Sequence, residues 1–106
     1  MNRPALLALW NRHLRGRIPP SSRDARVGDV YADLVDYDGY IAGIVTHLLE
    51  GITPEHAPRP NPGLRSRLAR MQRELDGQPL ARVNEYLAYL EHLEELAAFA
   101  HTVMAK

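Results

Sequence analysis

Hydrophobic residues recur every three or four positions along nearly the whole chain, which is the period of an α-helix. The longest such segment covers about residues 22–50, and the last one covers about residues 79–104. Strict alternation of apolar and polar residues, the sign of a half-buried strand, does not occur. The pattern therefore predicts an all-α protein. The apolar stripe of the longest segment consists of Val27, Val30, Leu34, Tyr37, Ile41, Ile44 and Leu48.

Two shorter periodic segments, about residues 4–15 and about residues 62–76, complete the predicted secondary structure. Glycines mark the ends of the predicted helices. Gly16 and Gly77 each follow a short segment, and Gly51 follows the longest one. We therefore expect a four-helix bundle with two long helices and two short ones.

The predicted helices differ in length by about a factor of two, roughly 40 Å against roughly 20 Å at about 1.5 Å per residue. Short helices cannot cover the long ones along their full length, so apolar surface remains. We predict that a second copy of the chain covers this surface, which makes the protein a homodimer with two-fold symmetry. The alternative is that the longest helix, which Ser21 and Asp24 would start as a capping box, is broken at Gly28.

The charged residues are sorted by segment, although the formal net charge is zero. Residues 1–26 hold six arginines and one aspartate, and residues 57–82 hold six arginines and two acidic residues. Residues 27–56 hold six acidic residues and neither Lys nor Arg, and residues 83–106 hold four glutamates and one lysine. The sign therefore alternates from one predicted helix to the next. If the four helices form a ring, we expect unlike charges to face each other at every seam.

Length and composition narrow the class of protein. The chain has the size of one domain, so residues 1–106 are predicted to form a single helical domain. Cysteine is absent, which excludes a disulfide framework and thiol catalysis. No apolar run approaches the roughly 20 residues that span a bilayer. We expect a cytoplasmic protein that binds no membrane, and the zero net charge argues against bulk binding of nucleic acid.

Asp38 is the strongest candidate for a functional side chain. Its helical neighbours three and four residues away are apolar, so its carboxylate is expected on an apolar face. A structural interpretation pairs it with Arg67 or Arg70, which would fix the register of two helices. A functional interpretation makes it a general base or a ligand anchor. The sequence favours the structural interpretation.

Asn84 and the pair Gly39 and Gly43 are also unusual inside predicted helices. Asn84 lies among apolar residues, where a polar side chain often fixes register or oligomeric state. Each glycine costs a helix about 1 kcal/mol relative to alanine. We expect a close helix crossing at this notch, filled by Trp10 or by a partner chain. The alternative is a ligand that approaches the backbone at the two glycines.

Histidine and glutamate raise the question of a metal. His47 precedes Glu50 by three residues, and His92 precedes Glu95 by the same spacing. Di-iron carboxylate bundles use the reverse order, Glu before His, with glutamates from two further helices. We therefore predict no metal site and no cofactor.

These observations predict a small soluble interaction or regulatory module that works through helix surfaces, as a homodimer or with another protein partner. The first alternative is a small-molecule-binding protein or a small enzyme with a polar site inside the bundle. In that case Asp38 is the acid or base, Tyr40 and Asn84 orient the ligand, and His47 or His101 transfers protons. The second alternative is a nucleic-acid accessory protein that uses the arginines of the third predicted helix, which the charge pattern disfavours. Whether the protein is an enzyme stays open, and the sequence favours a non-enzymatic role.

Overall fold

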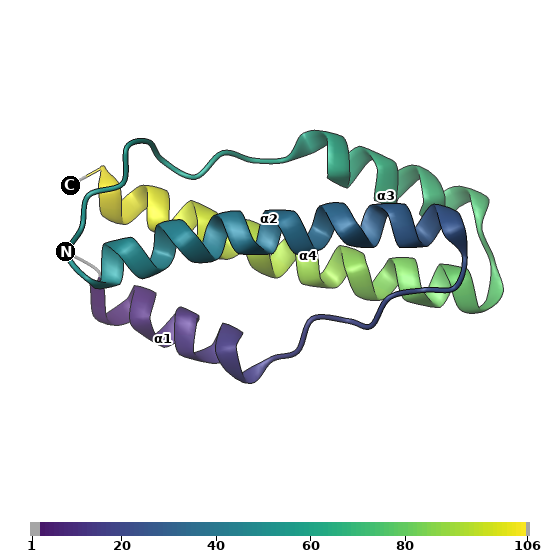
Figure 1. Cartoon of the computed structure of the whole chain (residues 1–106), viewed down its shortest axis with the longest axis horizontal. Coiled ribbons are helices and arrows are strands. Elements are labelled where there is room, and N and C mark those ends of the chain that lie inside the picture. The colour runs from purple at the N-terminus through teal and green to yellow at the C-terminus, as the bar shows by residue number, and fades with distance from the viewer. Residues whose placement is uncertain (1–2, 106) are drawn as a thin grey trace.

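The computed structural model describes residues 3–105, and these form a four-helix bundle (Figure 1). The helices are α1 (Arg3–Arg15), α2 (Ala25–Leu49), α3 (Pro62–Glu74) and α4 (Gly77–Met104). The predicted all-α class, with two long and two short helices, is confirmed. The bounds are close to those predicted except that α2 begins later than expected. No helix within this part of the chain has both the length and the apolar character needed to cross a membrane.

Asp24 caps the start of α2. Its backbone is extended, and its carboxylate accepts hydrogen bonds from the backbone N–H groups of Arg26 and Val27 at 3.0 and 3.3 Å. The predicted capping box at Ser21 is wrong, because the Asp24 side chain itself reaches the free N–H groups of the first turn. The Gly28 N–H donates to the Asp24 carbonyl at 2.8 Å, so the helix continues through the glycine without a break.

The two long helices lie side by side and run in the same direction, as the colour gradient in Figure 1 shows. α1 and α3 run opposite to this pair, and each of them contacts both long helices. α1 covers the end that holds the C-termini of α2 and α4, whereas α3 covers the end that holds their N-termini. Over residues 3–105, α1 and α3 do not contact each other. The short helices therefore cover opposite ends of one long pair.

The two connectors pack against the long helices as well. Residues 16–24 run along α4, where the Tyr86 hydroxyl donates a hydrogen bond to the Pro20 carbonyl at 2.8 Å. Residues 50–61 return toward α3, and Pro58 is buried there. We expected a second copy on the apolar surface that the short helices leave over, but the connectors cover part of that surface. The homodimer loses this premise and stays a prediction.

The buried core follows the helical periodicity. Every residue of the stripe predicted in α2 is buried, and Leu64, Leu68 and Met71 of α3 are buried against it. α4 contacts all three other helices, so its buried residues spread over a wide face that includes the fully buried Tyr86. α1 contributes Leu6 to this core. The core thus runs lengthwise between α2 and α4, and the short helices close it at each end.

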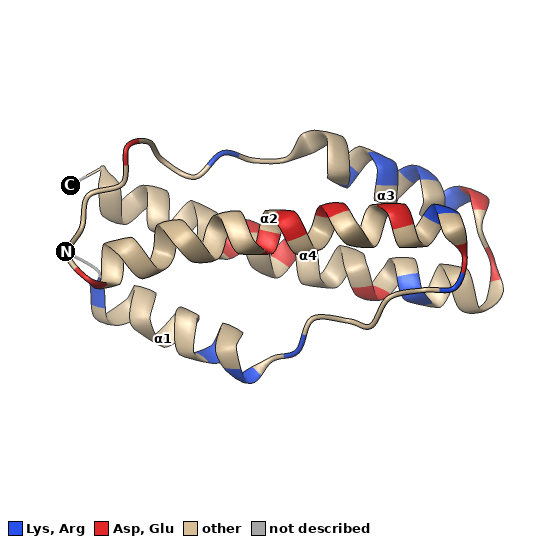
Figure 2. Cartoon of the chain, in the orientation of Figure 1, with Lys and Arg blue, Asp and Glu red and all other residues tan. Residues whose placement is uncertain are grey.

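Unlike charges meet where the short helices touch the long pair, and Figure 2 shows acidic positions of α2 beside the basic positions of α3. The expectation of unlike charges at every seam is wrong for the seam between α2 and α4, because both helices carry net negative charge and meet through the apolar core. The pairs are partly exposed, so each contributes about 0–1 kcal/mol and serves alignment more than stability. The ion pairs that join different helices through arginine are Arg12–Glu95 at 3.6 Å, Arg65–Glu94 and Arg67–Asp33.

Candidate functional site

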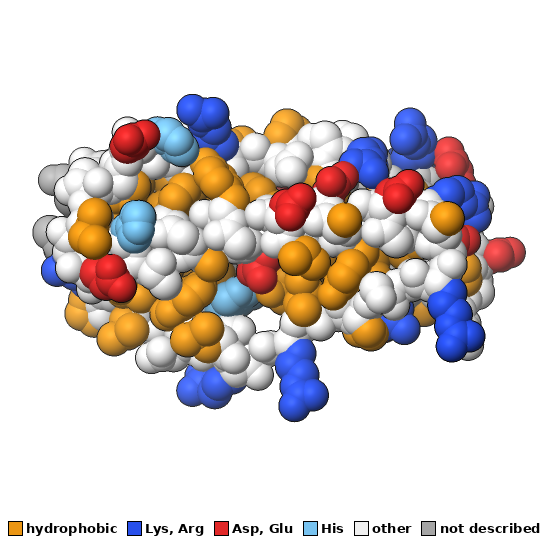
Figure 3. Space-filling view, in the orientation of Figure 1, with side chains coloured by type: hydrophobic (Ala, Val, Ile, Leu, Met, Phe, Trp, Pro, Cys, Tyr) orange, Lys and Arg blue, Asp and Glu red, His pale blue; other side chains and the backbone are white. Residues whose placement is uncertain are grey.

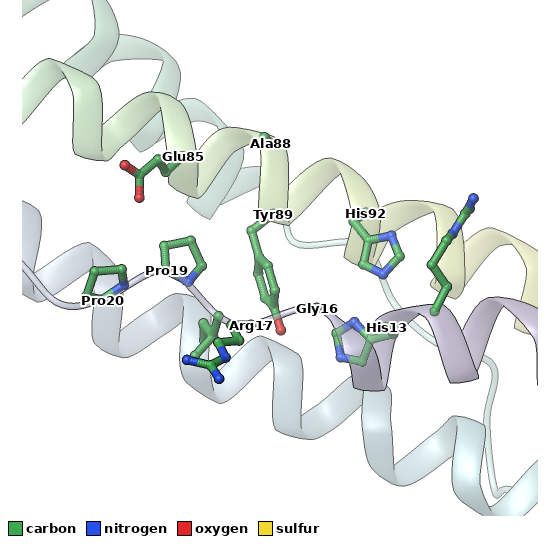
Figure 4. Close-up of a pocket in the computed structure, with 11 residues that line it drawn as sticks. His13, Gly16, Arg17, Pro19, Pro20, Glu85, Ala88, Tyr89 and His92 are labelled. Carbon is green, nitrogen blue, oxygen red and sulfur yellow. The ribbon is translucent and has the colours of Figure 1, made fainter.

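A groove with a volume of about 790 Å³ opens between the C-terminal end of α1, the connector that follows it and α4 (Figure 4). Its position follows from the local sequence. Gly16 stops α1, and its N–H donates to two carbonyls of the last turn at 3.1 and 3.2 Å. Pro19 and Pro20 keep the next residues extended, and the hydrogen bond from Tyr86 holds this stretch against α4. The connector therefore forms one wall of the groove.

Apolar groups from the connector and α4 line this groove, and polar groups enter it from α1 and α4. Apolar walls that enclose a few polar groups are typical of binding sites for small molecules. The apolar lining residues are Ile18, Pro19, Pro20 and Ala88, the uncharged or titratable ones are His13, Tyr89 and His92, and the charged ones are Arg12, Arg17 and Glu85.

Behind the groove, Asp38 of α2 binds His13 of α1. The His13 Nε2 atom lies 3.0 Å from a carboxylate oxygen of Asp38, with side chains that are 7% and 25% exposed. The predicted partners of Asp38, Arg67 and Arg70, are wrong, because α3 covers the opposite end of α2 from α1. Arg67 pairs with Asp33 instead.

Three rings contact the His13 imidazole of this pair and form a cluster with it. His13 stacks between Trp10, at a centroid distance of 5.3 Å, and His92, at 5.1 Å. Tyr89 lies tilted against the same ring at 5.8 Å. The Nδ1 atom of His13 is buried and has no hydrogen-bond partner among the described residues. The imidazole is therefore fixed by one carboxylate and by its ring neighbours.

Burial shifts the titration of two groups in this cluster. It raises the pKa of the Tyr89 phenol well above its usual range, and the negative charge of Asp38 adds to the rise. It lowers the pKa of the His92 imidazole, and the nearby His13 lowers it further, against a smaller opposing effect of Glu95. At neutral pH both Tyr89 and His92 are thus uncharged. The fixed charges that line the groove are those of Arg12, Arg17 and Glu85.

The sequence holds a signal for this cluster that the periodicity argument missed. Trp10 and His13 are three residues apart on α1, and Tyr89 and His92 are three residues apart on α4. Residues at that spacing share one helix face, so each helix presents an aromatic ring beside an imidazole. The pattern shows neither that these two faces meet nor that Asp38 joins them.

The other predicted site residues lie elsewhere. The Tyr40 hydroxyl accepts a hydrogen bond from the Arg59 backbone N–H at 3.0 Å, so it holds the second connector. Asn84 is exposed and accepts a hydrogen bond from the Gln72 side chain at 2.8 Å, which links α4 to α3. His47 is exposed on α2. Tyr40, Asn84 and His47 do not line the groove.

His101 also lies outside the groove, in a hollow of about 250 Å³ beside the second connector. Gly39 and Gly43 are exposed, and a Cβ atom added at either would meet no atom within 4 Å. The close crossing expected within the chain is therefore wrong, because no other helix passes that face of α2. Trp10, the predicted filler of the notch, stacks on His13 instead. A partner chain at this face stays a prediction.

Metal ligands do not converge in the described residues, where no group of three or more His, Asp or Glu side chains could hold an ion. Comparison of the chain with protein-family models, with curated proteins and with solved structures gives no match. The groove, the Asp38–His13 pair and the ring cluster are therefore the basis for a functional proposal.

Proposed function

We propose that the protein binds a small organic molecule in the groove between α1, the first connector and α4. The observation that carries this proposal is the meeting of three features in one place: an apolar wall, convergent polar side chains and, behind them, the partly buried Asp38–His13 pair. An apolar hollow with a few converging polar groups and shifted pKa values is the usual form of a ligand site.

Binding without turnover is the form that the geometry supports better. A general base needs an imidazole nitrogen within hydrogen-bond reach of the proton that it removes. The His13 Nε2 atom is taken up by Asp38, and its Nδ1 atom is buried. Neither nitrogen is open to a ligand in the groove, so the pair serves to position the lining residues.

The proposal is tested by filling the groove. Ala88 is an exposed residue of α4 that lines the groove, and Ala81 is an exposed residue of the same helix outside it. We expect Ala88→Trp to weaken binding of a neutral aromatic probe, naphthamide, by about tenfold, because the indole occupies the space of the probe. Ala81→Trp should bind the probe like the wild type.

Nuclear magnetic resonance titration with isotope-labelled protein measures both the affinity and the place of binding. Shifts that cluster at Tyr89 and His92 support the proposal. Equal affinities of the two tryptophan variants, or shifts confined to another region, would contradict it.

A second proposal is the interaction module, because α1 presents apolar side chains to solvent. Leu7 and Leu14 are 46% and 61% exposed and lie two turns apart on one face. Figure 3 shows hydrophobic side chains gathered over α1 and the adjoining part of α2. Such a surface favours a second copy or another protein as a partner.

The nucleic-acid alternative has less support. Two of the four arginines of α3, Arg65 and Arg67, form ion pairs with acidic residues of the long helices. Only Arg70 and Arg73 are left as exposed cations on that helix. This alternative stays a prediction that a gel shift persisting at about 200 mM salt would revive, because nonspecific phosphate contacts weaken steeply with salt.

A further inference from the structure

One broad face of the molecule keeps large apolar side chains exposed. Leu7 and Leu14 of α1 are exposed there, and Val35 of α2 is 40% exposed. On α1, Arg12 turns toward α4, where it pairs with Glu95, so the two leucines lie on the opposite flank, next to α2. These apolar side chains therefore lie on the side of the bundle that α1 and α2 share.

The middle of this face is bare backbone of α2. Gly39 and Gly43 are exposed, and a Cβ atom added at either would meet no atom within 4 Å. Val35 lies within one turn of Gly39 and of Asp38, which bonds α1, so the glycines and the apolar side chains adjoin. In Figure 1 α2 lies in front of α4, and the view looks onto a face with extents of 44 and 25 Å. Such a face has room for the roughly 800 Å² that each partner of a stable dimer buries.

The charges of α1 and α2 are sorted along this face. Asp29 and Asp36 are exposed in the N-terminal half of α2, and Arg3 and Arg15 are exposed on α1. None of these four side chains makes an ion pair with another residue in the range 3–105. Because α1 lies over the C-terminal half of α2, one chain has a basic half and an acidic half that do not neutralise each other.

Two-fold symmetry allows two ways to place α2 of one copy on α2 of another. With parallel helices, the acidic halves would face each other and repel. With antiparallel helices that cross at the glycines, each acidic half would lie beside the basic α1 of the other copy. The charges therefore favour the antiparallel arrangement, and the absence of side chains at Gly39 and Gly43 allows a close crossing.

The position of α1 along α2 suits the same arrangement. α1 runs opposite to α2, and the His13–Asp38 bond fixes their relative level. Leu7 comes six residues before His13, so it is level with about residue 44 of α2. Reversal about the two glycines would bring Leu7 of a second copy level with about residue 38, within one turn of Val35.

Resting on the proposed interaction module, we infer that its partner is a second copy of this chain, docked on this face with two-fold symmetry. The two α2 helices run antiparallel and cross at Gly39 and Gly43. Leu7 of each copy packs near Val35 of the other, which removes apolar area from water. The basic α1 of each copy lies beside the acidic half of the other α2, which sets the orientation of the pair.

Sedimentation velocity over a concentration series tests the place of docking. Gly43→Gln should raise the dissociation constant of the dimer by about tenfold, because a side chain at the crossing holds the two helices apart. Within one chain the added side chain meets open space, and glutamine favours a helix more than glycine does. The melting temperature of the dilute, monomeric variant should therefore not fall, which separates loss of the dimer from loss of the fold. Ala81→Gln, at an exposed position of α4, is the matched control and should dimerise like the wild type.

Cross-linking tests the orientation, and the absence of native cysteine makes single-cysteine variants specific. Ala32 and Glu50 are exposed on α2, at equal distances on either side of the midpoint between the two glycines. In an antiparallel dimer, position 32 of one copy is level with position 50 of the other. A short bismaleimide should therefore link a mixture of Ala32→Cys and Glu50→Cys into a heterodimer, and it should not link either variant to itself. A parallel dimer would give the reverse result.

The outcomes separate this inference from the interaction module on which it rests. A dimer that Gly43→Gln does not weaken, or that gives only self-linked cysteine variants, would overturn the antiparallel docking while the module remains. A single chain at all concentrations up to about 100 μM would overturn the second copy as the partner and leave the module to another protein. A dimer with the expected response to both tests supports the inference.

Discussion

His13 is the one buried polar residue within residues 3–105, and its surroundings explain how the core accepts it. A buried imidazole needs a hydrogen-bond partner for its N–H group, and the carboxylate of Asp38 only accepts. The Nε2 atom of His13 therefore carries a proton and donates it to the carboxylate of Asp38.

Removal of the Asp38 carboxylate should destabilise the fold. Asp38→Ala leaves the buried N–H of His13 without an acceptor, so we expect the free energy of unfolding to fall by about 1–3 kcal/mol. Urea denaturation measures this change. Asp36→Ala is the matched control, because Asp36 is an exposed aspartate of α2 and its loss should change stability by less than about 0.5 kcal/mol. Equal stability of the two variants would show that the Asp38–His13 bond contributes nothing.

His92 should make the fold sensitive to acid. Its pKa is lowered in the folded protein, so below about pH 6.5 the unfolded chain binds a proton more readily than the folded one. Stability is therefore full at neutral pH and falls as the pH drops through the ordinary histidine pKa toward the lowered one. The groups that face this ring are His13, Asp38, Glu95 and Arg12.

His92→Gln should reduce the loss of stability between about pH 7.5 and about pH 5.5, because the variant has no imidazole to protonate at this place. Urea midpoints at the two pH values give the comparison. His47→Gln changes an exposed histidine of α2 and should keep the wild-type pH dependence. The same pH dependence in wild type and His92→Gln would refute the role of His92.

At the scale of elements, two tyrosine side chains of α2 hold the second connector through its backbone. The Tyr37 hydroxyl donates to the Arg59 carbonyl at 3.0 Å, and the Arg59 N–H donates to the Tyr40 hydroxyl at 3.0 Å. The two tyrosines are three residues apart on α2 and so share a face. Together they bind the backbone carbonyl and the backbone N–H of Arg59, which keeps residues 50–61 against the long helices.

Tyr40→Phe should speed hydrogen exchange at the Arg59 amide, because that N–H loses its acceptor. The double variant with Tyr37→Phe should also lose about 1 kcal/mol of stability for each hydrogen bond removed. Arg59→Ala is the control, because the protein uses only the backbone of this residue in the two bonds. It should keep the slow exchange at position 59. Unchanged exchange in Tyr40→Phe would mean that the connector is held by other contacts.

The whole molecule is elongated, with extents of 44 × 25 × 17 Å, and its long helices are parallel neighbours. Two long helices that run in the same direction need a connection that runs back between them, and residues 50–61 together with α3 supply it. This arrangement places α1 at one end of the molecule, where its inner face contributes to the groove and its outer face carries exposed leucines. Ligand binding and self-association would therefore use opposite faces of the same helix.

The homodimer prediction belongs to this scale. If α1 is the interface, light scattering at micromolar concentration should give twice the chain mass of 12.0 kDa. The double variant Leu7→Glu with Leu14→Glu should give the mass of one chain, because two charges cannot be buried there without partners. Ala81→Glu adds a charge to an exposed part of α4 and should leave the dimer intact. A wild-type mass of one chain would contradict the dimer.

The sequence alone determined the helices, their approximate ends and the inward face of α2. The reason is that helical periodicity and stop signals such as Gly16 depend on neighbours within about four residues. The alternating charge blocks predicted the contacts of the short basic helices with the long acidic ones, as in the bonds of Arg12 and Arg65 to glutamates of α4, but not the contact between the two acidic helices. The charge blocks did not say which residue pairs with which.

Only the tertiary structure decided the site. The sequence predicted that Asp38 pairs with arginines of α3. Which end of the long pair each short helix covers depends on the course of the connectors, and no local sequence pattern encodes that course. Once α1 lies over the C-terminal half of α2, His13 meets Asp38, 25 positions away in the chain, and His92 joins from α4. Periodicity fixes which face of a helix is buried, whereas the partner of that face follows from rotation and placement of whole helices.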